Sequence, residues 1–184
     1  TGKVTFAGGA SPAWVFVEDL KGSSSGELEI KQQDKQFNPR IAAVPKGTKL
    51  IFANYDSIFH NVFSNSPGNG FDLGNSRSGE PPRSHVPGTP GVIDIFCNMH
   101  SKMSATVLVA PGPYLTRVGA DGSFKLDDVP VGQHRITAWI GGQKLVTKDV
   151  EVTTAGGEVS FELQAGEFGA HKKKDGQAYG SYSD

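Results

Sequence analysis

Three side chains that can bind a soft metal ion follow one another at equal spacing in the segment CNMHSKM, residues 97–103. The thiol of Cys97, the imidazole of His100 and the thioether of Met103 are each separated by two residues. The segment directly follows the alternating sequence VIDIF, which is typical of a strand. Because a turn at the end of a strand can aim several side chains at one point, we predict a ligand loop at this position.

His60 supplies a fourth donor from a distant part of the chain. It lies in the sequence NYDSIFHNVFSN, after the apolar run KLIFAN and before another short strand-like run. A thiolate with two imidazoles and a long, weak thioether contact forms a trigonal site with an axial neighbour, which suits both oxidation states of copper. The four residues together predict a site for one copper ion.

Each of these residues has an ordinary structural explanation when it is taken alone. A lone buried cysteine is usually a small core residue, and Met99 or Met103 by itself would be packing. Zinc also accepts one cysteine and two histidines, although a thioether does not particularly favour it. The joint spacing and the strand context favour copper and leave zinc as the competing metal.

The elements that must position these donors have the pattern of strands. Apolar stretches are short and alternating, and they end at Gly, Pro, Asn or Asp; the 24 glycines and 11 prolines make up about a fifth of the chain. No stretch predicts a convincing helix, and the expected fold class is all-β, with sandwiches or barrels. The predicted strands are Lys3–Phe6, Ala13–Glu18, Glu27–Gln32, Ile41–Val44, Lys49–Asn54, Asn61–Ser64, Val92–Cys97, Ala105–Val109, Tyr114–Val118, Ser123–Leu126, His134–Ile140, Lys144–Val150 and Glu158–Leu163.

Composition excludes several classes of protein. With 36% hydrophobic residues and 20% charged ones, the 184-residue chain can form a packed core. This composition excludes a disordered protein of the acidic or basic tail type. The formal net charge of −1 predicts no general attraction to nucleic acid or to an anionic membrane. The longest apolar runs, such as Ala13–Val17, are far too short to span a bilayer.

One cysteine cannot form an internal disulfide, so we expect core burial and a metal to stabilise the chain. The sequence opens without an initiator methionine and without a signal-peptide pattern. From this we expect a periplasmic or otherwise exported protein whose signal has been removed.

Residues 27–110 resemble a cupredoxin, a small blue copper domain. The first half of that resemblance lies in the stretch 29–64, with its GT, FAN and HNV motifs, and the Cys-x-x-His-x-x-Met loop is similar to the short ligand loop of amicyanin-type members. The resemblance implies a Greek-key sandwich with type 1 copper under the loops at one end. Carried over by position, it implies His60, Cys97 and His100 as equatorial ligands and Met103 as the axial ligand.

Asn61 resembles the family asparagine that ties the two ligand loops together and hydrogen-bonds near the sulfur, so we expect it beside the site without binding the metal. One position departs from the family pattern. Many relatives carry proline directly after the loop histidine, whereas this chain has Ser101, which has a backbone N–H and a less restricted φ.

A second resemblance covers the sequence GADGSFKLDDVPVGQHRITAWI, which is similar to the carboxypeptidase regulatory-like, transthyretin-type β-sandwich. That family also has a Gly-x-Val segment and an Ala-x-Val-x-Val segment, and their matches here lie at residues 2–4 and 13–17, before the copper domain. We therefore expect the copper domain, 27–110, to be inserted into a second sandwich formed by 1–26 and 111–165. The alternative makes residues 1–26 an additional edge strand of the cupredoxin. Residues 166–184 are expected to form a flexible tail.

The remaining histidines fit the copper site less well. His85 and His134 are expected to be structural or surface residues, and His171 lies beside three lysines in the predicted tail. The second sandwich has no convincing site.

The leading hypothesis is an exported blue copper protein that carries single electrons between redox protein partners. The alternative is a periplasmic copper carrier or storage protein with the same ligands. An enzyme is not expected, because a copper reductase or oxidase needs further clusters such as His-x-His, and the five histidines are scattered. A binuclear purple site would need a second cysteine in the loop. The sequence does not indicate the oligomeric state.

Overall fold

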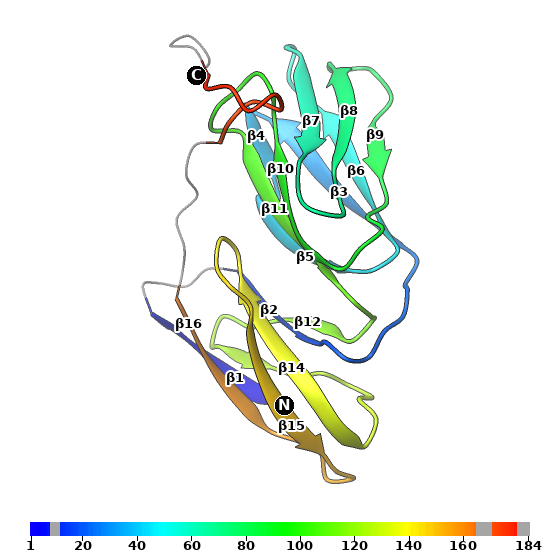
Figure 1. Ribbon diagram of the computed structural model, residues 1–184, viewed down its shortest axis with the longest axis vertical. Coiled ribbons are helices and arrows are strands. Elements are labelled where there is room, and N and C mark those ends of the chain that lie inside the picture. Colours follow the sequence, from blue (N-terminus) through cyan, green and yellow to red (C-terminus); the bar gives the residue numbers. More distant parts are fainter. Residues whose placement is uncertain (8–11, 165–170, 180–184) are drawn as a thin grey trace.

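The computed structural model describes residues 1–7, 12–164 and 171–179, and in these residues every regular element is a strand (Figure 1). The chain is therefore all-β, as the sequence predicts. The strands are β1 (Gly2–Ala7), β2 (Ala13–Val17), β3 (Gly26–Gln33), β4 (Gln36–Asn38), β5 (Ile41–Pro45), β6 (Thr48–Asn54), β7 (His60–Ser64), β8 (Phe71–Ser76), β9 (Arg83–His85), β10 (Gly91–Phe96), β11 (Ser104–Ala110), β12 (Leu115–Arg117), β13 (Ser123–Phe124), β14 (Gly132–Ile140), β15 (Val146–Val152) and β16 (Val159–Gln164). No described helix has the length and apolar character that crossing a membrane would take.

All thirteen predicted strands overlap an observed one, whereas β4, β8 and β9 were not predicted. β4 and β9 have three residues each and offer no alternation to detect. β8 pairs only with β7, at the end of its sheet, and contains a glycine with positive φ. Phe71 and Leu73 of its sequence FDLGNS alternate and pack against the core, but two apolar residues before a glycine are too short a pattern to predict a strand.

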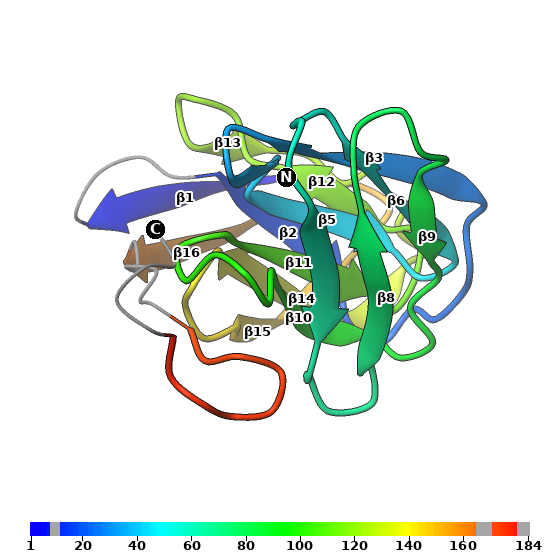
Figure 2. The same ribbon diagram turned by 90° about the horizontal axis from the view of Figure 1, so that it is seen from above.

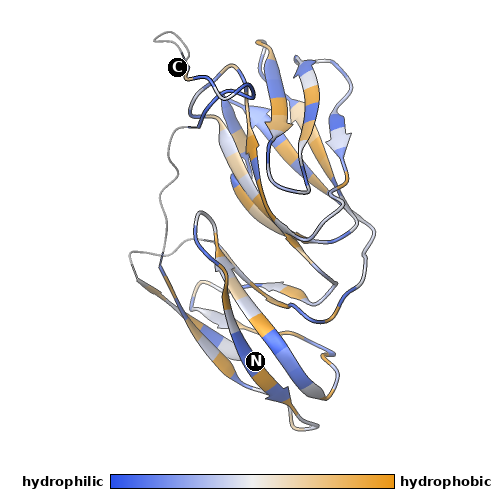
Figure 3. Ribbon diagram, viewed as in Figure 1, coloured by the Kyte–Doolittle hydropathy of each residue, from blue (hydrophilic) through white to orange (hydrophobic). Residues whose placement is uncertain are grey.

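Residues 26–110 form two sheets that face each other. One has the strand order β5-β11-β10-β7-β8 and the other has the order β4-β3-β6-β9. Apolar residues alternate with polar ones along several of these strands, and their inner faces share one core (Figure 3). This upper sandwich in Figure 1 carries all four predicted metal ligands.

The strands before residue 26 pair with strands after residue 111. β1 lies between β13 and β16, and β2 lies between β12 and β14, with β15 completing the second sheet. Val15 of β2 and Phe124 of β13 belong to one buried core. The chain thus forms part of the lower sandwich of Figure 1, passes through the upper one and returns.

A further buried cluster joins the two sandwiches. It contains Trp14, Phe16 and Trp139 from the lower sandwich with Leu108 and Ala110 of β11 from the upper one. Every residue of β11 is buried, because one of its faces lies in the core of the upper sandwich and the other lies against the lower sandwich. This explains why its sequence SATVLVA is almost continuously apolar.

The two connectors between the sandwiches also contact each other. Gly22 N–H donates to the carbonyl of Pro111 at 3.0 Å, and Ser24 N–H donates to the carbonyl of Lys46 at 2.8 Å. A Cβ at Gly112 would lie 2.1 Å from the carbonyl oxygen of Leu20, so glycine permits the close approach. The connector that contains Gly22 and Ser24 therefore has defined backbone partners.

Of the stretch that we expected to be a flexible tail, the structure describes residues 171–179, and these make hydrogen bonds to the ligand loop. Residues 165–170 and 180–184 lie outside the described part of the chain. The segment is red in Figure 1 and lies at the end of the upper sandwich that is remote from the lower one. Seen from above in Figure 2, it runs along the outside of the sheets.

Candidate metal centre

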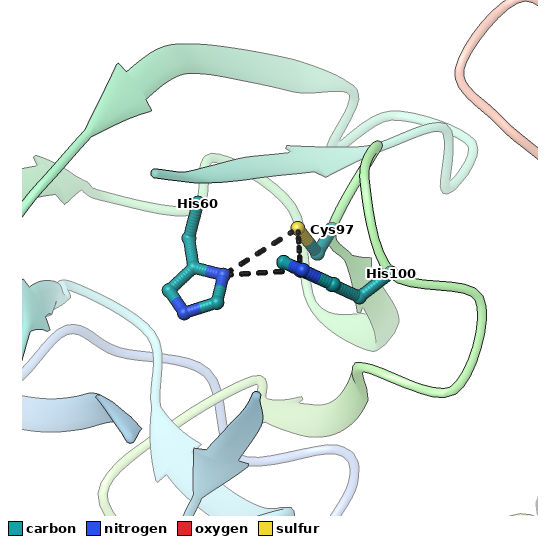
Figure 4. A group of neighbouring side chains, drawn as sticks. All are labelled: His60, Cys97 and His100. Atoms are coloured by element: carbon teal, nitrogen blue, oxygen red, sulfur yellow. Dashed lines mark hydrogen bonds between the residues drawn. The ribbon is translucent and has the colours of Figure 1, made fainter. Parts of the chain in front are cut away.

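Two neighbouring strands and one loop bring His60, Cys97 and His100 together (Figure 4). His60 is the first residue of β7, and Cys97 directly follows β10, which pairs with β7 through Phe96 and Phe63. The loop from Cys97 to Met103 then turns back, with Cys97 N–H donating to the carbonyl of Met103 at 3.1 Å. This turn places Nδ1 of His100 3.5 Å from the sulfur of Cys97.

The three donor atoms have the spacing that a bound ion requires. Nδ1 of His60 lies 3.2 Å from Nδ1 of His100, and Sγ of Cys97 lies 4.0 Å and 3.5 Å from these two nitrogens. An ion bonded to nitrogen at about 2.0 Å and to sulfur at about 2.3 Å needs donors roughly 3.3–3.7 Å apart. The observed distances bracket this range, so the donor set fits a metal ion at its centre.

The site is closed on the side of the protein core. His60 and Cys97 are fully buried, and His100 is half-buried. Met103 is also fully buried and belongs to the same core cluster as Cys97. The structure therefore brings the two predicted histidines and the cysteine into one group, with the predicted axial methionine in the core beside them.

Asp56 orients His60 from the side away from the sulfur. Its Oδ2 lies 2.7 Å from Nε2 of His60, which leaves Nδ1 to face the other donors. The backbone N–H groups of Asp34 and Lys35 donate to the two oxygens of Asp56, at 2.8 and 3.0 Å. Burial would raise the pKa of Asp56, but these hydrogen bonds and the one with His60 lower it, so the group stays a carboxylate.

Asn54 shapes the loop that carries Asp56. Its Nδ2 donates to the carbonyls of Ile58 and Ser76, and its Oδ1 accepts from the N–H of Asp56 at 2.8 Å. Sequence reasoning missed the role of Asp56. The available signal was a carboxylate four residues before the histidine that we predict to bind the metal, in the loop between two predicted strands.

The surroundings of Cys97 favour the thiolate. Burial alone would raise the pKa of the thiol, but hydrogen bonds with His60 and with the backbone N–H groups of Asn61, Met99 and His100 lower it. Burial opposes the charged form of His60, and its hydrogen bonds with Cys97 and Asp56 raise its pKa. Burial and the nearby charge of His60 lower the pKa of His100. Because a thiolate and a neutral imidazole are the forms that bind metal ions, Cys97 and His100 are shifted toward their binding forms, whereas His60 must release a proton to bind an ion.

Asn61 contacts the site through its backbone. Its N–H is one of the donors to the sulfur of Cys97, whereas its side-chain Nδ2 donates to Oδ1 of Asp72 on β8 at 2.9 Å. The side chain thus ties β7 to β8. Oδ1 of Asn61 is buried and has no hydrogen-bond partner among the described residues.

The other histidines lie outside the donor group. His85 on β9 stacks on Phe71 with ring centroids 4.3 Å apart, and burial lowers its pKa. The ring of His134 bonds Asp19 through Nδ1 at 2.8 Å and the carbonyl of Pro130 through Nε2 at 2.9 Å. His171 lies against the ligand loop, stacked on Phe96.

The donors also limit the choice of metal. One thiolate, two imidazoles and a buried thioether nearby are soft or intermediate ligands, which suit copper or zinc and do not suit magnesium or calcium. The group His60, Cys97 and His100 fits a type 1 copper site.

No protein-family model and no curated protein matches the chain. Among solved structures, it is similar to an oxidized methionine-to-leucine variant of amicyanin, with 16% identity and a TM-score of 0.41 over 45% of this chain and 80% of that chain. It is also similar to the novel purple cupredoxin from Nitrosopumilus maritimus, with 23% identity and a TM-score of 0.39 over 46% and 99% of the two chains. A third similar structure is the copper-containing nitrite reductase (NirK) from Thermus scotoductus SA-01, with 19% identity and a TM-score of 0.42 over 45% and 22%. The assignment of the metal centre rests on the geometry of its donors.

Proposed function

We propose that this protein is a blue copper protein that carries single electrons between redox protein partners. His60, Cys97 and His100 would hold one type 1 copper ion, with Met103 as the axial ligand. The observation that carries the proposal is the convergence of two imidazole Nδ1 atoms and one sulfur within 4.8 Å of one another, with Cys97 and His60 fully buried. Copper in such a donor set supplies the uptake and release of one electron.

In this function the protein holds the metal-donor atoms in fixed positions. Asp56 fixes the ring of His60, and three backbone N–H groups fix the sulfur of Cys97. Donors that are held by the fold move little when the charge at the site changes, which favours fast electron transfer. Burial of His60 and Cys97 keeps bulk water away from the donors.

His100 is the ligand through which we expect electrons to pass, since it is half-buried and the other two are fully buried. The loop directly before His60 exposes two apolar side chains, Ile58 at 41% and Phe59 at 48%. These residues, with the partly buried Met99, would form the small apolar contact that a transient redox encounter requires.

Repeated redox cycling tests the function. The copper-loaded protein is reduced and reoxidised many times in the presence of a copper chelator, and its bound copper is measured after each cycle. An electron carrier keeps its copper throughout. Steady transfer of copper to the chelator, with no loss of fold, would instead support the copper carrier or storage protein.

We also propose that the chain has two domains, with a copper domain at 27–110 inserted into a carboxypeptidase regulatory-like sandwich formed by 1–26 and 111–165. The support is the pairing of β1 and β2 with strands that follow residue 111. We propose that the protein works outside the cytoplasm, as the sequence predicts. Cell fractionation with an antibody against the protein tests this, and recovery in the cytoplasmic fraction would contradict it.

A further inference from the structure

The segment 171–179 is joined to the ligand loop by three hydrogen bonds. Tyr179 Oη donates to the carbonyl of Cys97 at 2.5 Å, and Nε2 of His171 lies 3.3 Å from the carbonyl of His100. Between them, the N–H of Lys174 donates to Oδ1 of Asn98 at 2.9 Å. The segment therefore bonds three of the seven loop residues, and two of these are metal ligands.

Aromatic packing holds the segment in the same place. The ring of His171 stacks on Phe96, with centroids 4.3 Å apart and an interplanar angle of 23°. The ring of Tyr179 stands edge-on to His171 at 5.2 Å, and its Oη lies 3.4 Å from Nδ1 of His171. Burial raises the pKa of the Tyr179 phenol, so the hydroxyl keeps the proton that it donates.

A charged contact anchors the middle of the segment to β8. Nζ of Lys174 lies 2.7 Å from Oδ2 of Asp72, and this ammonium holds the pKa of the carboxyl down to about 2. The other oxygen of Asp72 accepts from the side chain of Asn61, whose backbone N–H bonds the sulfur of Cys97. The segment therefore reaches the ligand group along two routes, through the loop and through β8.

These contacts use backbone groups of the ligand residues and leave their donor atoms free. The carbonyl of His100 accepts from His171 and also from the N–H of Met103, which lies at 3.1 Å. The carbonyl of Cys97 accepts from Tyr179. A contact of this kind restricts the backbone on both sides of each donor and does not compete for the metal.

We propose that segment 171–179 is a positioning element of the metal centre, which holds loop 97–103 in its metal-binding conformation before the ion arrives, with Tyr179 as its principal residue. The inference rests on the proposed metal site, but it concerns the order of the loop itself. A loop that is already ordered loses less conformational freedom when it binds an ion, so the ion binds more tightly and leaves more slowly.

Hydrogen exchange in the metal-free protein tests the proposal without using the metal. Tyr179→Phe keeps the ring and removes the hydroxyl. We expect the backbone amides of 97–103 to exchange about fivefold faster in this variant, because the loss of one ordinary hydrogen bond changes an opening equilibrium by about that factor. The exposed Lys172→Ala in the same segment and Tyr114→Phe in the lower sandwich are the matched controls, and both leave the loop unchanged. Amides of β14 and β15 report that the rest of the fold is intact.

A second readout uses the copper-loaded protein. Tyr179→Phe is expected to release copper to a chelator about fivefold faster than either control variant. The double variant Tyr179→Phe/Lys174→Ala is expected to release it faster still. If loop exchange and copper release in both variants equal those of the controls, the positioning role is wrong. If the wild-type protein lacks a type 1 spectrum, the proposed function fails, and the exchange experiment still decides the role of the segment.

Discussion

Oδ2 of Asp56 lies 2.7 Å from Nε2 of His60, on the side of the ring opposite the sulfur of Cys97. The contact fixes which nitrogen of the buried histidine faces the donor group. Asp56 is itself held by two backbone N–H groups from the turn between β3 and β4. The orientation of the proposed metal ligand His60 on β7 thus depends on a turn in the opposite sheet.

Replacing this carboxylate is expected to weaken metal binding. Asp56→Asn removes the charge and makes the tautomer of His60 less certain, so we expect copper affinity to fall by about 10- to 100-fold. Competition with a chelator of known affinity measures this. Asp34→Asn is the matched control, because asparagine tolerates the positive φ of that position and the backbone N–H is retained. Equal affinities for the two variants would contradict the role of Asp56.

Replacing the proposed axial ligand Met103 is expected to change the reduction potential without removing the visible colour. Met103→Leu conserves the volume of this fully buried side chain and removes the sulfur, so the three other donors and the visible colour remain. Loss of a weak donor to the oxidised ion is expected to raise the potential. Met99→Leu is the control, because the side chain of Met99 packs against the core from the same loop and the substitution keeps the backbone N–H that bonds the sulfur. Protein-film voltammetry compares the variants, and an equal potential in both would remove Met103 from the ligand set.

The contact between Asp19 and His134 is expected to stabilise the lower sandwich in a pH-dependent way. Oδ2 of Asp19 bonds the His134 ring, and its Oδ1 accepts from the N–H of Arg135. Burial would raise the pKa of Asp19, but these hydrogen bonds lower it below 3.8. A depressed folded-state pKa adds stability above the unfolded value, and that stability is lost as the pH falls through the folded value.

Asp19→Asn is therefore expected to lower the free energy of unfolding by about 1–2 kcal/mol at pH 7. The difference from the wild type should begin to shrink as the pH falls below 3.8, because the unfolded state then binds a proton at Asp19, and it should vanish only below the lower folded-state pKa. Urea unfolding at pH 7 and at pH 3 measures both values. A difference that stays constant between the two would show that the charge of Asp19 contributes nothing.

Gly141 permits the close approach of the two sandwiches. A Cβ at this position would lie 2.7–2.9 Å from three side-chain atoms of Ile41 on β5. Gly141→Ala is expected to destabilise the fold by about 1–3 kcal/mol through this overlap. Gly88→Ala is the control, because a Cβ there meets nothing within 4 Å.

A double-variant cycle shows whether the overlap is the cause. Ile41→Ala removes all three atoms that the new methyl group meets, so it should cancel most of the cost of Gly141→Ala. Free energies of unfolding of the two single variants and the double variant provide the comparison. Additive losses would mean that Gly141 acts through its backbone rather than through contact with Ile41.

The local sequence pattern is sufficient to predict the fold class and the donor group. The alternation of VIDIF and the glycines and prolines between strands predict an all-β chain, because each strand buries one face and each turn needs special residues. The spacing of Cys97 and His100 and the strand before His60 predict the donor group, which the structure brings together. These signals depend on residues that are close in sequence or on side chains with unusual chemistry.

The missed features depend on contacts between distant residues. Asp56 is held by N–H groups of residues 34 and 35, and a backbone N–H has no sequence signal. The segment around the three lysines has no apolar periodicity, so it resembled a solvated tail. Its hydrogen bonds to the ligand loop end on the carbonyls of Cys97 and His100, which every residue type possesses.

The central claim is that the thiolate of Cys97 and two imidazoles hold one copper ion in a trigonal site. Visible absorption and copper EPR of the Cu(II)-loaded protein test this most directly, with Cys97→Ala measured beside the wild type. The account predicts an intense thiolate-to-copper band and a narrow copper hyperfine splitting in the wild type, both absent from Cys97→Ala. A colourless wild-type protein with wide hyperfine splitting, or colour that persists in Cys97→Ala, would contradict it.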